Sequence, residues 1–122
     1  MRPRDMLKQP SRFGHDGVSA ADWIFKENYA LVLAALFQHE FARGLRAYFR
    51  AGSMPLTRWC SYHQVDYEHW LNIRRGVVRL SMEDLTFFLM AAGEHPDALV
   101  HFPSWIEMAQ NTLNAWADGE WG

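Results

Sequence analysis

The 122-residue chain is long enough for one domain with a hydrophobic core, and its net charge is −2. Its single cysteine excludes an internal disulfide and fits a reducing cytoplasm. No apolar run approaches the roughly 20 residues that a membrane span needs, and no signal-peptide pattern opens the sequence, so we expect a soluble, cytoplasmic protein.

Residues 1–18 are polar, rich in Pro and Gly, and without sustained periodicity, which predicts a flexible and mostly irregular arm. Its basic side chains would allow it to touch DNA, as basic arms do in some regulators: Arg2, Arg4, Lys8 and Arg12. The alternative is a terminus with ordinary solubilising charge.

A long helical pattern follows the capping box formed by Ser19 and Asp22. An unbroken helix over residues 20–51 would be unusually long for so small a domain, so we expect a break near Gln38 to Glu40. This leaves an extra N-terminal helix that is nearly apolar all round over residues 30–37. Such a helix is buried on more than one side, either crossing the core or packing on a second subunit.

Short helices are predicted next, each with a recognisable start or end. The helix over 41–51 ends at Gly52, and the following helix opens at Pro55. Asp66 caps the next one, because its carboxylate can accept from backbone amides one turn on, and Gly76 ends it. Ser81 and Asp84 form a capping box that starts a further helix closed by Gly93.

The C-terminal part is acidic and rich in Trp. A short helix or turn opens at Pro96, Pro103 breaks the chain, and Ser104 with Glu107 caps an amphipathic helix over 103–122 that serves packing or dimerisation. The apolar stripe of this helix is the expected dimer or partner surface: Trp105, Met108, Leu113 and Trp116. The whole chain is therefore predicted to be all-α, with one helical domain over residues 19–102.

The segment over residues 54–76 resembles the helix-turn-helix of the lambda-repressor-like (Xre-type) DNA-binding family. The resemblance extends over roughly residues 38–101, without a gap, and rests on Cys60, Val65, Asp66, Trp70, Ile73, Gly76, Ser81 and Leu85. Three positions depart from the family pattern. Gln64 replaces the usual turn Gly, Arg74 replaces a Glu, and Leu80 replaces a Pro. Gln64 could take the left-handed conformation of that turn only at a cost of about 1 kcal/mol.

The resemblance implies that the helix beginning after Asp66 lies in the DNA major groove. The residues expected to contact base edges are Tyr67, Glu68, His69 and Asn72. Phosphate contacts are expected from Arg58, Arg75, Arg79 and the backbone amides of the helix that starts at Ser81. On the alternative interpretation these are ordinary surface residues of a helical protein.

Charge is distributed unevenly, and its distribution is independent of the motif. Residues 43–79 contain seven arginines against Asp66 and Glu68, a balance of +5, whereas residues 80–122 contain seven carboxylates and no Lys or Arg. The basic block coincides with the proposed DNA-binding segment, as expected when one face meets phosphates.

Other kinds of site find little support in the sequence. The six histidines include no pair at i, i+4 on one helix, and Cys60 is expected in the core, so we predict no metal, no cofactor and no enzyme activity. The first hypothesis is a sequence-specific regulator of double-stranded DNA, a bacterial or phage-type repressor or autorepressor. It would act as a homodimer on half-sites about 34 Å apart. The alternative is a protein-interaction module, such as an adaptor, antitoxin-like partner or phage inhibitor, that uses its acidic C-terminal half.

Overall fold

The computed structural model describes residues 2–24, 29–52, 54–92, 111 and 114. Three short 3₁₀ turns come first: η1 (Pro3–Met6), η2 (Pro10–Arg12) and η3 (Ala20–Asp22). Four α-helices follow: α1 (Tyr29–Ala51), α2 (Leu56–His63), α3 (Tyr67–Arg75) and α4 (Met82–Ala92). The described part of the chain is mostly helical and contains no strand, which confirms the all-α prediction.

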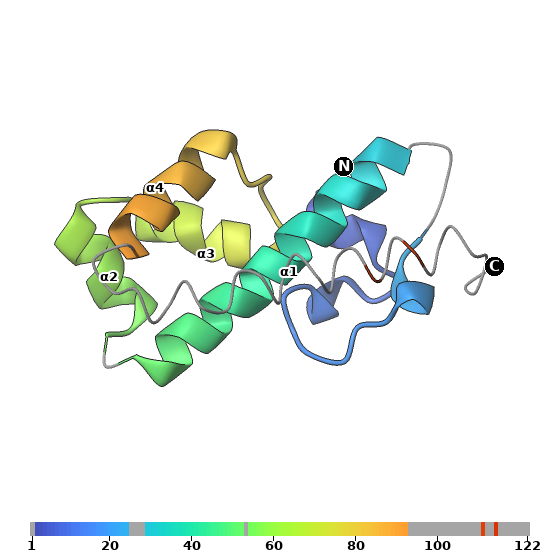
Figure 1. Cartoon of the computed structure of the whole chain (residues 1–122), viewed down its shortest axis with the longest axis horizontal. Coiled ribbons are helices and arrows are strands. Elements are labelled where there is room, and N and C mark those ends of the chain that lie inside the picture. Colours follow the sequence, from blue (N-terminus) through green and yellow to red (C-terminus); the bar gives the residue numbers. More distant parts are fainter. Residues whose placement is uncertain (1, 25–28, 53, 93–110, 112–113, 115–122) are drawn as a thin grey trace.

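Helix α1 runs diagonally through the molecule and has a different neighbour on each half (Figure 1). Its C-terminal half packs with α2, α3 and α4 around the helix core, whose buried members are Phe41, Leu45, Leu56, Trp59, Cys60, Trp70, Ile73, Phe88, Ala91 and Ala92. Its N-terminal half packs with the 3₁₀ turns around the N-terminal core, formed by Met6, Leu7, Phe13, Trp23, Val32, Ala35, Leu36 and Ala42.

Aromatic rings dominate the helix core. The rings of Trp59 and Trp70 meet edge to face with centroids 5.1 Å apart, and those of Phe41 and Phe88 do so at 5.4 Å. Such pairs contribute about 0.5 to 1.5 kcal/mol each beyond the area that they bury. The first pair joins α2 to α3 and the second joins α1 to α4. The ring of Trp59 also lies 6.0 Å from that of Phe88, so the two short helices are held by α4 as well and do not depend on helix propensity alone.

The predicted break in the long helix is wrong, because α1 continues through Gln38, His39 and Glu40. These three polar side chains are buried. Gln38 and His39 hydrogen-bond to segments distant in sequence, and Glu40 forms an ion pair within α1. Gln38 donates to the carbonyls of Ile73, in the last turn of α3, and Val78, after it. His39 accepts from the N–H of Gly14 at 2.8 Å, and Glu40 pairs with Arg43 at 2.8 Å. Burial of these groups is therefore compatible with an uninterrupted helix.

The segment predicted as a flexible, irregular arm is instead packed against α1. Leu7 and Phe13 are 2% and 1% exposed, and the segment closes on itself through the hydrogen bond from Ile24 N–H to the Met6 carbonyl, 2.7 Å long. The capping box of Ser19 and Asp22 is present, but it starts the turn η3 and not the long helix. The apolar residues of the segment, spaced without period, supply one side of the N-terminal core.

None of the described helices is long and apolar enough to cross a membrane. The predicted helix end at Gly93 lies outside the described residues, and of the amphipathic C-terminal helix only residues 111 and 114 are described, both of them helical. All four residues expected on its dimer or partner surface lie outside the described residues: Trp105, Met108, Leu113 and Trp116.

Candidate nucleic-acid interface

Helices α2 and α3 are joined by a turn of three residues whose geometry follows from their sequence. Gln64 ends α2 in the left-handed conformation, with φ 58° and ψ 44°, and the N–H of Val65 bonds the Cys60 carbonyl at 2.9 Å. Asp66 caps α3 by accepting from the N–H of Glu68 at 3.1 Å, which confirms its predicted role. Gly76 ends α3 at φ 72°, also as predicted.

Helix α3 has one buried and one accessible side. Trp70, Leu71 and Ile73 are buried, whereas Glu68 and Arg75 are exposed and Asn72 is half-buried. Glu68, Asn72 and Arg75 are spaced at i, i+4 and i+7, so they form one polar stripe along the helix. Two of the four expected base-contact residues, Glu68 and Asn72, thus share the stripe with one expected phosphate contact.

The other two expected base-contact residues are placed differently. Tyr67 is half-buried and packs against the helix core. His69 Nε2 lies 3.0 and 3.1 Å from the two carboxylate oxygens of Asp84, so it ties α3 to the start of α4. With that nitrogen occupied, the ring of His69 fixes the angle between two helices and is less free to read a base.

Ser81 is exposed, but its polar groups are directed into the protein. Its backbone N–H and its hydroxyl both donate to Asp84 Oδ2, at 3.3 and 2.8 Å. Burial of Asp84 opposes its ionisation, yet the hydrogen bonds from Ser81 and His69 outweigh this effect and hold its pKa below the usual value. A carboxylate therefore occupies the helix start at which a phosphate contact was expected.

The remaining expected phosphate contacts, Arg58, Arg75 and Arg79, are all exposed. They come from three different segments: α2, the end of α3 and the loop before α4. None of them forms a side-chain hydrogen bond or an ion pair with another described residue. Their guanidinium groups are available to an external anion.

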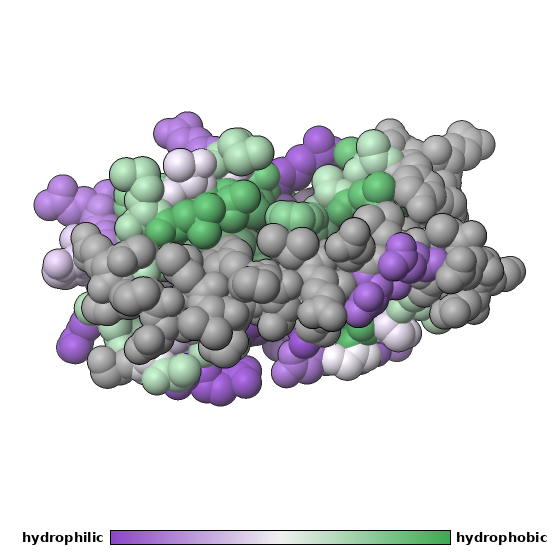
Figure 2. All heavy atoms as spheres, viewed as in Figure 1, coloured by the Kyte–Doolittle hydropathy of each residue, from purple (hydrophilic) through white to green (hydrophobic). Residues whose placement is uncertain are grey.

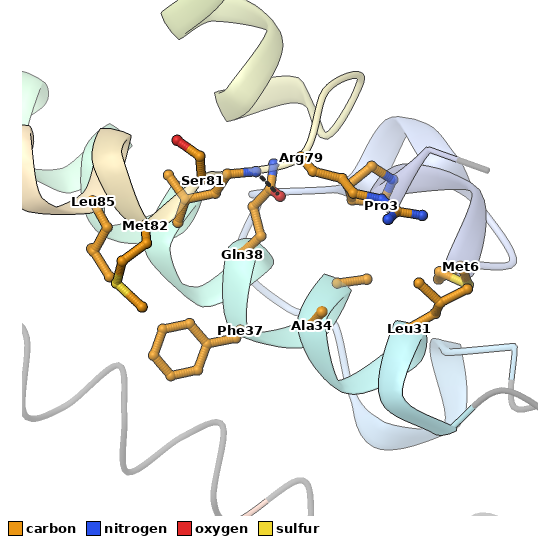
Figure 3. Close-up of a pocket in the computed structure, with 12 residues that line it drawn as sticks. Pro3, Met6, Leu31, Ala34, Phe37, Gln38, Arg79, Ser81, Met82 and Leu85 are labelled. Carbon is orange, nitrogen blue, oxygen red and sulfur yellow. Dashed lines mark hydrogen bonds between the residues drawn. The ribbon is translucent and has the colours of Figure 1, made fainter.

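Gln38 positions the loop that follows α3, a role that the sequence did not reveal. Its side-chain amide donates to the carbonyls of Ile73 and Val78, at 3.0 and 2.8 Å, and its Oε1 accepts from Leu80 N–H at 2.7 Å (Figure 3). A proline at position 80 would have no N–H to donate and would lose the last of these bonds. The one available signal was a polar residue inside an apolar helical run.

The same loop borders a mostly apolar cavity of about 290 Å³ between α1, η1 and the start of α4 (Figure 3). Its apolar wall includes Leu31, Ala34 and Phe37 of α1, with Met82 and Leu85 of α4 on the other side. Arg79 and Ser81 also line it. The cavity therefore lies beside the loop and apart from the polar stripe of α3.

The described charges divide into a neutralised and an unneutralised half. In the first 43 residues, Asp5, Asp16, Asp22 and Glu40 are each ion-paired with an arginine. Between residues 46 and 79, in contrast, the arginines form no ion pair with a described carboxylate. These arginines are Arg46, Arg50, Arg58, Arg74, Arg75 and Arg79. Apart from Arg43, which pairs with Asp16 and Glu40, the basic block predicted from the sequence thus has no counter-ions among the described residues.

Chemically reactive groups are scarce in the described residues. No three His, Cys, Asp or Glu side chains among them are grouped so that they could hold a metal ion. Cys60 is 1% exposed, as expected for a core residue, and its burial raises the pKa of the thiol to about 11. At neutral pH this thiol is protonated, which makes it a poor nucleophile.

No family model, curated protein or solved structure matches the chain.

Proposed function

We propose that this protein is a sequence-specific double-stranded DNA-binding transcriptional regulator, of the repressor or autorepressor kind, in which α2 and α3 act as a helix-turn-helix. The observation that carries the proposal is the polar stripe of α3 together with the arginines around it, which have no counter-ion among the described residues. DNA supplies the counter-ions that such a surface lacks, since each neutralised phosphate releases a condensed cation.

Helix α3 has the dimensions and the side chains for reading a groove. Its nine residues extend over about 13 Å, and a major groove about 12 Å wide admits an α-helix. Asn72 can pair with an adenine through two hydrogen bonds, and Glu68 can accept from a cytosine amino group. Each such contact discriminates between bases by about 1 to 3 kcal/mol.

The arginines set the register. Arg58, Arg75 and Arg79 come from three segments that the helix core and Gln38 hold together, so their guanidinium groups form a fixed set of phosphate contacts. Contacts of this kind orient a protein on the duplex without reading its sequence.

Two substitutions separate reading from positioning. Arg75→Ala should weaken binding to every duplex to a similar degree and lower the slope of log affinity against log salt by about 1. Asn72→Ala should change the preferred site while leaving binding to random DNA nearly unchanged. Fluorescence anisotropy against a random pool and against a selected site measures both effects.

Lys8→Ala is the matched control, because Lys8 is exposed on a segment that packs against the N-terminal half of α1 and is not the free arm that could have reached DNA. It removes one positive charge without touching the proposed interface. If all three variants bind like the parent, the roles assigned to Arg75 and Asn72 are wrong.

A protein-interaction module is the second candidate, and an exposed apolar face favours it. Apolar side chains gather over α4 and the N-terminal half of α1 (Figure 2). Phe37, Met82 and Met90 are 46%, 77% and 73% exposed. A regulator would use such a face for homodimerisation, and an adaptor would use it for a different protein. Sedimentation of the pure protein distinguishes the two, since only a homodimer forms without a second component.

A further inference from the structure

Two arginines meet where the N-terminal segment, α1 and the end of α3 come together. The Nε atoms of Arg46, on α1, and Arg74, on α3, are buried, and neither has a hydrogen-bond partner among the described residues. Gly14 lies against both. A Cβ built on Gly14 would be 2.9 Å from the Arg74 carbonyl oxygen and 3.3 Å from Arg46 Nε. We call this site, formed by Arg46, Arg74 and Gly14, the arginine junction.

The groups around the junction are nearly all cationic. The pKa of Arg46 is lowered first by its burial and then by the positive charges of Arg74, Arg50 and Arg75. Burial also lowers the pKa of His15, and Arg46 adds to that effect. The nearby carboxylate of Asp16 is already bound to Arg43, 3.0 Å away.

Such an arrangement is costly without an anion. Bringing guanidinium groups together and removing part of their water costs free energy unless an opposite charge is present. The C-terminal end of α3 supplies only about half a negative charge, which offsets one cation in part and leaves the other uncompensated. An oxyanion with several acceptor atoms would supply both the charge and the hydrogen-bond partners that the two Nε–H groups lack.

The junction is separate from the polar stripe of α3. At 3.6 residues per turn, Arg74 projects about 160° around the helix from Asn72. Its carbonyl oxygen is close to the N-terminal segment, which packs on α1 and not on the exposed side of α3. A ligand here would therefore contact α3 from the side opposite to the proposed reading face.

We propose that the arginine junction binds a small tetrahedral oxyanion of the phosphate class, held by the guanidinium groups of Arg46 and Arg74 and walled by the backbone at Gly14. Planar guanidinium groups match phosphate oxygens through paired N–H donors, which favours phosphate over a halide. The anion links the N-terminal segment to the end of α3. Free phosphate and a DNA phosphodiester share this chemistry.

The test titrates the protein with inorganic phosphate at constant ionic strength, kept with sodium chloride, and follows Tm and the heat of binding. The parent should gain Tm as phosphate replaces chloride. Arg46→Gln and Arg74→Gln should each weaken phosphate binding by about tenfold or more, since a lost charged hydrogen bond is worth at least 1.4 kcal/mol. Without phosphate, both variants should unfold at or above the parent's Tm, because each removes the charge repulsion between Arg46 and Arg74.

Lys8→Gln is the matched control, because Lys8 is an exposed cation outside the arginine junction, and it should respond to phosphate like the parent. The proposal is overturned if phosphate and chloride shift the parent's Tm equally, or if the two junction variants respond like Lys8→Gln. Should neither junction variant fold, two other measurements test the proposal. The parent should release or absorb heat on binding phosphate, and Arg74→Lys, which keeps the charge but loses the planar group, should bind phosphate more weakly than the parent. No heat of binding by the parent would overturn the proposal.

A final arm identifies the source of the anion. If rising phosphate weakens duplex binding by the parent but not by Arg74→Gln, the site takes a DNA phosphodiester. If it leaves duplex affinity unchanged, the site takes free phosphate. The phosphate titration needs no DNA, so a protein that fails to bind any duplex would contradict the proposed function and leave the junction's test intact.

Discussion

Single buried polar residues account for the main difference between the predicted helices and the observed ones. Gln38 and His39 lie side by side in α1, and each bonds to a segment distant in sequence, at Ile73 and Gly14. The helix length alone predicts a break near these residues, because a sequence shows their polarity and not the partners that keep them inside one helix. Asp66, Gly76 and the Ser81–Asp84 box, in contrast, were predictable, since a cap bonds within three residues.

His39 should make stability depend on pH. Burial, and then the charge of Arg43, lower its pKa to about 3, against about 6.5 in the unfolded chain. The unfolded state therefore binds more protons between these values, so the free energy of unfolding falls as the pH drops below about 6.5. The slope due to this residue is about 1.4 kcal/mol per pH unit.

Urea denaturation of the parent and His39→Gln at several pH values between 7 and 4 measures that slope. The variant should lose the His39 part, so its stability should fall less steeply with acid than the parent's. Parallel pH profiles for the two proteins would contradict the burial of a neutral imidazole at this position.

At the scale of elements, the short helices follow from local signals and the loop between α3 and α4 does not. The left-handed turn at Gln64 was foreseen with its cost, and the structure has it. The loop's anchor is Gln38, 35 to 42 residues away. Long-range hydrogen bonds of this kind leave no periodic trace in the sequence, which is why the loop's position could be predicted but neither its anchor nor the continuous α1 could.

Gln38→Leu should destabilise the protein by about 2 to 4 kcal/mol. The change keeps most of the side-chain volume but leaves the carbonyls of Ile73 and Val78 and the N–H of Leu80 without their partner, and each unsatisfied buried group costs about 1 to 3 kcal/mol. Urea denaturation measures the loss, with Gln9→Leu as control, since Gln9 is exposed. Equal stability of the two variants would mean that the loop does not depend on α1.

At the scale of the whole molecule, α1 joins two cores into one cooperative body. Phe13 of the N-terminal core lies directly against Gly76 at the end of α3, where an added Cβ would be 2.6 Å from Phe13 Cδ1. Arg4 N–H also bonds the Gly76 carbonyl at 2.9 Å. The N-terminal segment therefore supports the end of the helix that we propose reads DNA.

Phe13→Ala tests this connection. A phenylalanine that is 1% exposed should cost about 3 to 5 kcal/mol on truncation, because both its burial and its packing are lost. Thermal unfolding followed by Trp fluorescence, to which Trp23 of the N-terminal core contributes as well as Trp59 and Trp70 of the helix core, should show one transition at lower temperature. Two separate transitions, one of them at the parent's temperature, would show that residues 2–24 and the helix core unfold independently.

The charge of the molecule bears most directly on the central claim that it binds duplex DNA. The decisive measurement is fluorescence anisotropy of the parent protein with a random duplex pool and with the DNA upstream of its own gene, at 50 and 200 mM salt. Three phosphate contacts per protomer, from Arg58, Arg75 and Arg79, predict a loss of affinity of about 40-fold per protomer between the two salt concentrations. We expect that loss together with tighter binding to the upstream DNA, whereas no binding to either duplex at 50 mM would contradict the proposed DNA-binding function.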